Sequence, residues 1–311
     1  MSDATGFRVM RQWRLRRRQL TLGARTLVMG VVNITPDSFS DGDLYLEPER
    51  AVEHALRLLD EGADLLDLGA ESTRPGSHAG DPQTAAVSAD EEQARLLPVL
   101  EQVLKARPEA VISVDTYKSA TARAAVVAGA EIVNDVSGFM WDAQMAAACA
   151  ELGCGVVLMH TRGRPEQWRS QPQLDAEPLL TMVFEGLRAS LTTALKAGVS
   201  EDAVVLDPGY GFGKRFEENY SLLARQGRLL ELGRPLLAGL SRKSFLSRTL
   251  LKLPGSAERF VDGQVAEASR EIAGITGLVA AILHGASIVR VHDVRAAVEA
   301  AAIADAVLAG C

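Results

Sequence analysis

The chain has 311 residues, with 33 Lys and Arg against 40 Asp and Glu, and a formal net charge of −7. Hydrophobic residues make up 47% and charged residues 23%, a globular composition that excludes disordered and fibrous proteins. The negative net charge argues against a nucleic-acid-binding protein, and we expect no nucleic-acid partner.

The first 25 residues form a basic segment with seven arginines and a single acid, Asp3. Residues 19–23 do not supply the apolar stretch and cleavage site of a secretory signal. We therefore expect residues 1–25 to form a solvated arm or hairpin across one end of the fold, and residues 26–311 to form one domain. Cys149, Cys154 and Cys311 lack the spacing of a zinc site or a disulfide framework, which indicates free thiols in a reducing cytoplasm.

Short apolar runs alternate with helical patterns from residue 27 onward. The helical patterns carry apolar residues at the spacing of one helix face, as at Ala51, Ala55 and Leu58. The predicted strands are residues 27–32, 65–68, 110–114, 131–133, 155–159, 203–206, 235–240 and 288–291. Parallel strands joined by helices form either a doubly wound sheet or a closed barrel. About eight such units favour an α/β fold of the (β/α)8 TIM barrel type, and no Gly-x-Gly-x-x-Gly turn follows the first strand to favour a dinucleotide-binding sheet.

One long stretch, residues 272–289, contains no Lys, Arg, Asp or Glu and reaches the length at which membrane spans begin. Gly274, Gly277, His284, Gly285 and Ser287 interrupt it. This pattern predicts a buried helix followed by a strand, and we expect no membrane association.

A polar side chain stands at or just after the end of every predicted strand. In a parallel barrel these carboxyl ends meet at one mouth, where the chemistry of such barrels takes place. One Asp at a strand end is typically a helix N-cap, but capping does not explain a polar group at every exit. The residues are Asn33, Asp67, Asp115, Asn134, His160, Asp207, Ser241 with Lys243, and Arg290 with His292.

Four loops after the strands are rich in Gly, Pro, hydroxyl and basic residues, which allow tight turns and bind anionic oxygen. They are residues 33–42, 71–76, 207–214 and 241–244. With the segments 113–116, 134–138, 158–160 and 290–294, they resemble in sequence and order the dihydropteroate synthases of folate biosynthesis, a pterin-binding barrel family. The resemblance covers roughly residues 26 to 308.

This resemblance implies an enzyme, a transferase that joins 4-aminobenzoate to the CH₂ group of 6-hydroxymethyl-7,8-dihydropterin diphosphate. Pyrophosphate is released, and Mg²⁺ is the implied cofactor. The family also implies inhibition by sulfonamides, which resemble aminobenzoate. We expect a cytoplasmic homodimer, since the alanine-rich helix predicted at residues 294–308 could pack against a second copy.

Matching residue by residue, the resemblance assigns four kinds of position. The pterin-binding positions are Asp115, Asn134, Asp207 and Lys243. The diphosphate positions are Thr73, Arg74, Arg290 and His292. The metal position is Asn33, with Asp41 a weaker candidate. The aminobenzoate pocket comprises Phe39, Pro75, Phe212 and Ser244. Those expected to act in catalysis are Asp115, Lys243, Arg290 and His292.

The chemistry of these side chains agrees with the assignment. The carboxylate of Asp207 can accept the two parallel N–H donors on the pterin edge as a fork. Lys243 can donate to the ring carbonyl and to N5 of the pterin. Arg290 and His292 would neutralise the diphosphate while its C–O bond breaks, and Asp115 would stabilise positive charge on the exocyclic carbon.

The sequence departs from the family at three places. Thr161 and Arg162 follow His160 where members often have Met-Gln, Ala70 stands where Gly is usual, and residues 164–175 are idiosyncratic. His160 can equally be a structural histidine at a strand end.

Two alternatives stay open. A pterin-dependent methyltransferase domain would share the barrel, but it does not call for the loops at residues 71–76 and 241–244 together. A catalytically silent pterin-binding paralogue is disfavoured because Lys243, Arg290 and the first-strand loop are all present.

Overall fold

The computed structural model describes residues 8–34, 47–72, 79, 87–255 and 264–310. Within this part, eight parallel strands close into a barrel in the order β10-β3-β4-β5-β6-β7-β8-β9. They are β3 (Leu27–Asn33), β4 (Leu65–Gly69), β5 (Ile112–Asp115), β6 (Ile132–Asp135), β7 (Gly155–Met159), β8 (Val204–Asp207), β9 (Leu236–Ala238) and β10 (Ala286–Val291). The predicted (β/α)8 barrel is confirmed, and every strand lies within two residues of its expected bounds.

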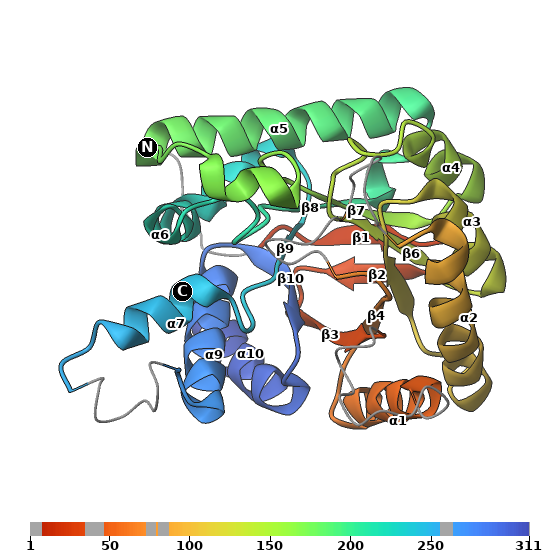
Figure 1. The fold of residues 1–311 in the computed structure, drawn as a ribbon, viewed down its shortest axis with the longest axis horizontal. Helices are drawn as coiled ribbons and strands as arrows, with labels where there is room; N and C mark the ends of the chain where they lie inside the picture. Colours follow the sequence, from red (N-terminus) through yellow and green to blue (C-terminus); the bar gives the residue numbers. More distant parts are fainter. Residues whose placement is uncertain (1–7, 35–46, 73–78, 80–86, 256–263, 311) are drawn as a thin grey trace.

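Helices surround the barrel in chain order (Figure 1). They are α1 (Glu47–Asp60), α2 (Ala89–Ala106), α3 (Ser119–Ala128), α4 (Met145–Leu152), α5 (Ala176–Ala197), α6 (Phe216–Arg225), α7 (Ser244–Leu251), α9 (Glu267–Leu283) and α10 (Val294–Ala309). Short 3₁₀ helices are η2 (Pro165–Ser170), η3 (Glu201–Ala203) and η4 (Gln226–Leu232). The apolar stretch at residues 272–289 is α9 followed by β10, as predicted. In the part of the chain that the structure describes, no helix has the length and apolarity to cross a membrane.

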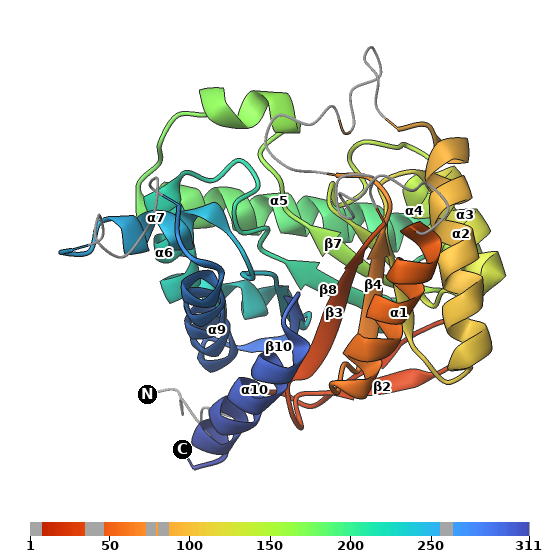
Figure 2. The same cartoon turned by 60° about the horizontal axis from the view of Figure 1, so that its bottom comes forward.

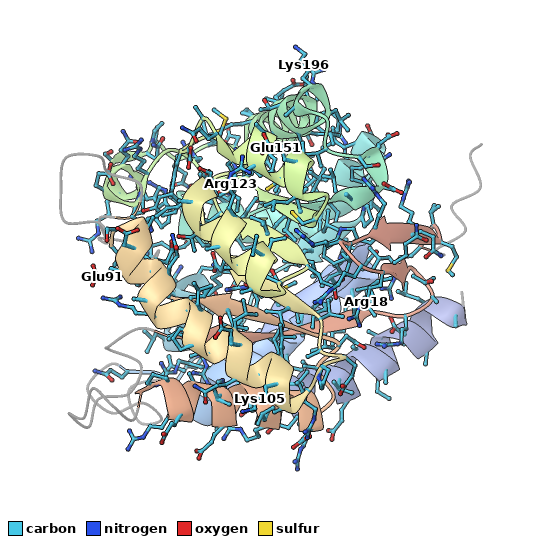
Figure 3. The ribbon with its side chains drawn as sticks, turned by 90° about the vertical axis from the view of Figure 1, so that its right-hand side faces the viewer. Arg18, Glu91, Lys105, Arg123, Glu151 and Lys196 are labelled. Carbon is cyan, nitrogen blue, oxygen red and sulfur yellow. The ribbon has the colours of Figure 1, made fainter. Side chains whose placement is uncertain are left out.

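The outer faces of the helices carry charged side chains. Figure 3 shows this on α2, α3 and α4, where Arg123 and Glu151 lie close together. Their ion pair of 2.7 Å joins α3 to α4, and both side chains are exposed. Because solvent screens such pairs, they contribute little to stability, and the packing of the helices against the barrel depends on the apolar faces beneath.

Alternation along the strands builds the interior of the barrel in layers. One apolar layer is formed by Met29, Leu65, Ile132, Val157, Val205, Leu237 and Ile288. Side chains two residues further along a strand point to the same face. This periodicity places Asp67, Asn134, Asp207 and Arg290 inside the barrel, on the mouth side of the apolar layer.

The N-terminal segment forms an antiparallel hairpin of β1 (Arg11–Arg14) and β2 (Gln19–Leu22). Figure 2 shows it across one end of the barrel. The hairpin is therefore confirmed, but the expectation of a solvated segment is wrong for its inner face. Trp13 is 0% exposed and packs into the apolar layer with Leu15 and Leu22. Its indole Nε1 donates to the Ala203 carbonyl at 2.9 Å.

The arginines of this hairpin bind the end of the barrel that it covers. Arg17 donates to the Gly129 carbonyl at 2.6 Å and Arg18 to the Glu109 carbonyl at 2.8 Å. Arg18 also lies 2.9 Å from the carboxylate of Glu131, which is fully buried. The basic composition of the segment thus serves intramolecular contacts, with carbonyls and a carboxylate that precede the strands.

Candidate active site

The strand ends at the mouth enclose a cavity that seven of the predicted site residues line. The structure brings together there Asp115, Asn134, Asp207, Phe212, Lys243, Arg290 and His292. Val136 and Met159 give it an apolar wall. Ser244 is the first residue of α7 and is exposed, outside the cavity lining. Asn33 ends β3, while Phe39, Asp41, Thr73, Arg74 and Pro75 lie outside the described residues.

Asp207 ends β8 with its side chain only 6% exposed. Its Oδ1 accepts the Gly209 N–H at 2.7 Å, which fixes the carboxylate at the wall of the cavity. Burial raises the pKa of Asp207, opposed by this hydrogen bond and by the charge of Lys243. Gly209 has φ of +69°, and a Cβ there would lie 2.0 Å from the His160 carbonyl oxygen, so the turn requires glycine.

Lys243 precedes α7 and extends back over the cavity. Its Nζ lies 4.1 Å from the ring centroid of Phe212, a cation–π contact. Burial lowers the pKa of Lys243 to about 8, and the carboxylate of Asp207 opposes this shift. Phe212 also meets Trp168 edge to face, with ring centroids 5.1 Å apart. Trp168 belongs to η2, so the idiosyncratic segment at residues 164–175 packs against a wall of the cavity.

Arg290, on β10, joins two carboxylates across the barrel. Its Nε donates to Asp67 Oδ2 at 2.6 Å and its Nη2 to Asp115 Oδ2 at 2.8 Å. The same oxygen of Asp67 accepts the Nδ2–H of Asn134 at 2.9 Å. Burial raises the pKa of Asp115 to about 7, although Arg290 lowers it. Burial alone would lower the pKa of Arg290, but Asp67 and Asp115 raise it, so the guanidinium stays charged.

Asp67 was predicted at a strand end, but no role was predicted for it. The available signal was a carboxylate within the otherwise apolar run of β4, where a charge has to be paired. The apolar wall from Val136 and Met159 was also missed, because apolar residues at strand ends look like ordinary core.

His292 follows β10 and is oriented by a residue that follows β9. The hydroxyl of Ser241 lies 3.1 Å from the His292 Nδ1 and 3.3 Å from its backbone nitrogen. Both residues line the cavity beside Arg290. The hydroxyl of Ser241 therefore fixes the imidazole of His292 at the lining of the cavity.

His160 is not part of this cavity lining. Its imidazole is buried against α5, so that a Cβ on Gly186 would lie 2.5 Å from the ring. Burial lowers the pKa of His160 well below its usual range, which keeps the ring neutral. Arg162, the departure beside it, forms a buried ion pair with Glu218 at 3.3 Å and donates to the Pro172 carbonyl at 2.9 Å. Both residues thus have structural positions in this loop region.

The geometry defines a (β/α)8 barrel with a polar cavity at the carboxyl ends of its strands, the place where enzymes with this fold have their active sites. The family described as pterin binding enzyme matches residues 29–292. Over 289 residues the chain is 39% identical to the dihydropteroate synthase of Bacillus subtilis (strain 168), covering 93% of this chain and 91% of that protein. It therefore belongs to the pterin binding enzymes and, within them, to the dihydropteroate synthases.

Solved structures agree along nearly the whole chain. The Xanthomonas albilineans dihydropteroate synthase with 4-aminobenzoic acid superposes with a TM-score of 0.82 at 39% identity, covering 97% of this chain and 99% of that one. The same enzyme in complex with 7,8-dihydropteroate gives a TM-score of 0.78 at 38% identity, and the match covers 95% of this chain and 99% of that one. These relatives are synthases rather than methyltransferases.

Proposed function

We infer that this chain catalyses the dihydropteroate synthase reaction. The bond between the exocyclic CH₂ carbon of the dihydropterin and the diphosphate oxygen breaks, and its electron pair leaves with pyrophosphate. The amine nitrogen of 4-aminobenzoate forms the new C–N bond and loses a proton. The observation that carries this inference is the convergence of Asp115, Asn134, Asp207 and Lys243 with Arg290 at one mouth, in a chain related to these synthases throughout.

The pterin ring would lie between the polar wall and the apolar one. Asp207 accepts from the 2-amino group and the adjacent ring N–H, while Lys243 donates to the ring carbonyl. Val136 and Met159 cover a ring face. Because these groups lie on or next to strand ends that the barrel holds in place, little ordering is needed when the ring binds.

Arg290 and His292 would act on the leaving group. Pyrophosphate gains negative charge as the C–O bond lengthens, and a fixed guanidinium at the mouth stabilises that charge at little reorganisation cost. The remaining positive charge lies on the exocyclic carbon and the ring, where the carboxylate of Asp115 would stabilise it. Aminobenzoate then attacks without prior deprotonation, and no covalent bond to the protein is needed.

We propose Mg²⁺ as the cofactor, held through the side-chain oxygen of Asn33. Asn33 ends β3 two residues after Val31, which pairs with Asp67, so its side chain is on the inner face at the mouth. One neutral oxygen fits magnesium when water and phosphate oxygens complete the octahedron. Bound there, the ion would help to neutralise the leaving diphosphate.

A pyrophosphate-release assay tests this proposal. Release should require the dihydropterin diphosphate, 4-aminobenzoate and Mg²⁺ together, and chelation should stop it reversibly. Asn33→Ala should raise the Mg²⁺ concentration for half-maximal activity by about tenfold, the typical loss for a metal-site side chain. Release that continues after chelation, or an unchanged Mg²⁺ requirement in N33A, would contradict the metal assignment.

We propose a homodimer through α10. Ile303 and Val307 lie one helical turn apart and are 69% and 52% exposed, an apolar pair on the outer face of that helix. Ile303→Asp should convert a dimer to a monomer in light scattering, and a monomeric wild type would contradict the proposal.

We also propose a cytoplasmic location, which is consistent with the free thiols of Cys149 and Cys154. We further propose that sulfonamides inhibit this protein in competition with aminobenzoate.

A further inference from the structure

Asp67 lies in the middle of β4 as the polar residue of an apolar strand, and it is 0% exposed. Pairing between the strands places it opposite Val31 of β3 and Ser113 of β5, inside the barrel. Burying a carboxylate is costly unless charged or hydrogen-bonding groups pair with it. The groups that pair with Asp67 therefore explain why a carboxylate is tolerated at this buried position.

Both partners of Asp67 are residues that the proposed function uses. Oδ2 alone accepts the Nε–H of Arg290 and the Nδ2–H of Asn134, at 2.6 and 2.9 Å. We propose that Asp67 is a positioning residue, which holds Arg290 toward the diphosphate and orients the Asn134 amide toward the pterin; this inference rests on the proposed function.

The effect of Asp67 on the orientation of the Asn134 amide follows from hydrogen-bond chemistry. A carboxylate oxygen only accepts, so only the NH₂ end of the amide can face Asp67. The amide oxygen of Asn134 is thereby turned away from Asp67, in a residue that lines the cavity. Asp67 thus selects which end of the amide is available as an acceptor for an N–H of the pterin.

The effect of Asp67 on the orientation of Arg290 follows from the shape of the guanidinium. The group is planar with five N–H donors, so fixing Nε on Asp67 and Nη2 on Asp115 fixes its plane. Nη1 has no hydrogen-bond partner among the residues that the structure describes, and it can serve the diphosphate. Without Asp67, only Asp115 would hold Arg290, and Asp115 is itself needed beside the pterin ring.

Ser113 offers a matched control. It is also 0% exposed, lies opposite Asp67, and its hydroxyl forms no hydrogen bond within the described part of the chain. Ser113→Ala changes the same interior layer without touching the contacts to Arg290 or Asn134. The Oδ1 of Asp67 likewise lacks a hydrogen-bond partner among the described residues.

The test compares D67A, D67N and S113A in steady-state dihydropteroate synthesis, with wild type in the same assay. D67A leaves the Nε–H of Arg290 and the Nδ2–H of Asn134 without their acceptor, so kcat/KM should fall about 30-fold or more. D67N keeps an oxygen that can accept both donors, so it should remain within about fivefold of wild type, and S113A within about threefold. D67N as poor as D67A, or S113A as poor as D67A, would overturn the proposal.

Two further readouts separate positioning from a general structural role. In an R290A background, D67A should lower kcat by less than about threefold, because coupled residues are not additive. Affinity for a dihydropterin without diphosphate should still fall about tenfold in D67A through Asn134. The same kcat loss in both backgrounds would show that Asp67 does not act through Arg290.

If D67A does not fold, the proposal can be tested by NMR of arginine side chains in the wild type and in D67N, which measures hydrogen exchange of the Arg290 Nε–H. The Nε–H of Arg290, identified with R290K, should exchange slowly in both proteins before ligand is added. Rapid exchange in the folded wild type would overturn the proposal. An inactive wild type would instead overturn the proposed function, so the two failures are distinguishable.

Discussion

Replacing Arg290 with alanine is expected to reduce kcat/KM for the dihydropterin diphosphate by about 10³-fold, since loss of one preorganised donor to a developing anion costs about 10²–10³. The substitution also leaves Asp67 and Asp115 without their shared cation. The free energy of unfolding should therefore fall by about 3 kcal/mol in urea titrations. Binding of a dihydropterin that lacks the diphosphate should change by less than about fivefold, measured by calorimetry.

Arg290→Lys is the matched control. It retains the positive charge but cannot donate to Asp67 and Asp115 in the fork geometry of the guanidinium. Its activity should lie between those of R290A and the wild type. An equal loss of affinity for both pterin ligands in R290A would show that Arg290 maintains the pocket rather than acting on the diphosphate.

Asp207→Asn is expected to reduce pterin affinity at least about tenfold, because the new NH₂ faces an N–H of the ring and leaves a buried donor unpaired. It should also change the pH profile. Burial lowers the pKa of Lys243 to about 8, and its ammonium form donates a stronger, charge-assisted hydrogen bond than the neutral amine, so kcat/KM of the wild type should fall as pH rises through that value. Asp207 raises the pKa of Lys243, so the alkaline loss should move to lower pH in D207N.

Asp135→Asn serves as its control, since Asp135 is another buried strand-end carboxylate, 0% exposed, but is not part of the cavity lining. Its oxygens accept the backbone N–H groups of Ser137 and Phe139. D135N should lose stability and retain pterin affinity within about threefold. Two results would contradict the role given to Asp207. One is unchanged pterin affinity in D207N, and the other is a fall in kcat/KM that occurs at the same alkaline pH in D207N as in the wild type.

The strands were predictable because their signal is local. The run at residues 155–159 is apolar throughout, and β7 has those bounds. At residues 235–240 the strand is shorter, Leu236–Ala238, because the chain leaves the ladder toward the mouth and continues to Ser241 and Lys243 of the cavity. Strand order and the alternation of side chains then bring the predicted strand-end residues together.

Side-chain partners across the barrel were not predictable in this way. Asp67 contacts Asn134, 67 residues away, and Arg290, 223 residues away, so no spacing in the sequence reports the contacts. The burial of Trp13 was hidden because the surrounding arginines suggested a solvated arm. In both cases the missing information is which groups the closed barrel brings into contact.

The cavity at this mouth is expected to join a dihydropterin to an arylamine with loss of pyrophosphate. The most direct measurement incubates the purified protein with both substrates and Mg²⁺ and quantifies both products in the same samples, dihydropteroate by mass spectrometry and pyrophosphate enzymatically. We expect equal amounts of the two at every time point, with formation of both abolished when either substrate is omitted. Pterin binding without any dihydropteroate, or pyrophosphate release that does not need aminobenzoate, would contradict the account.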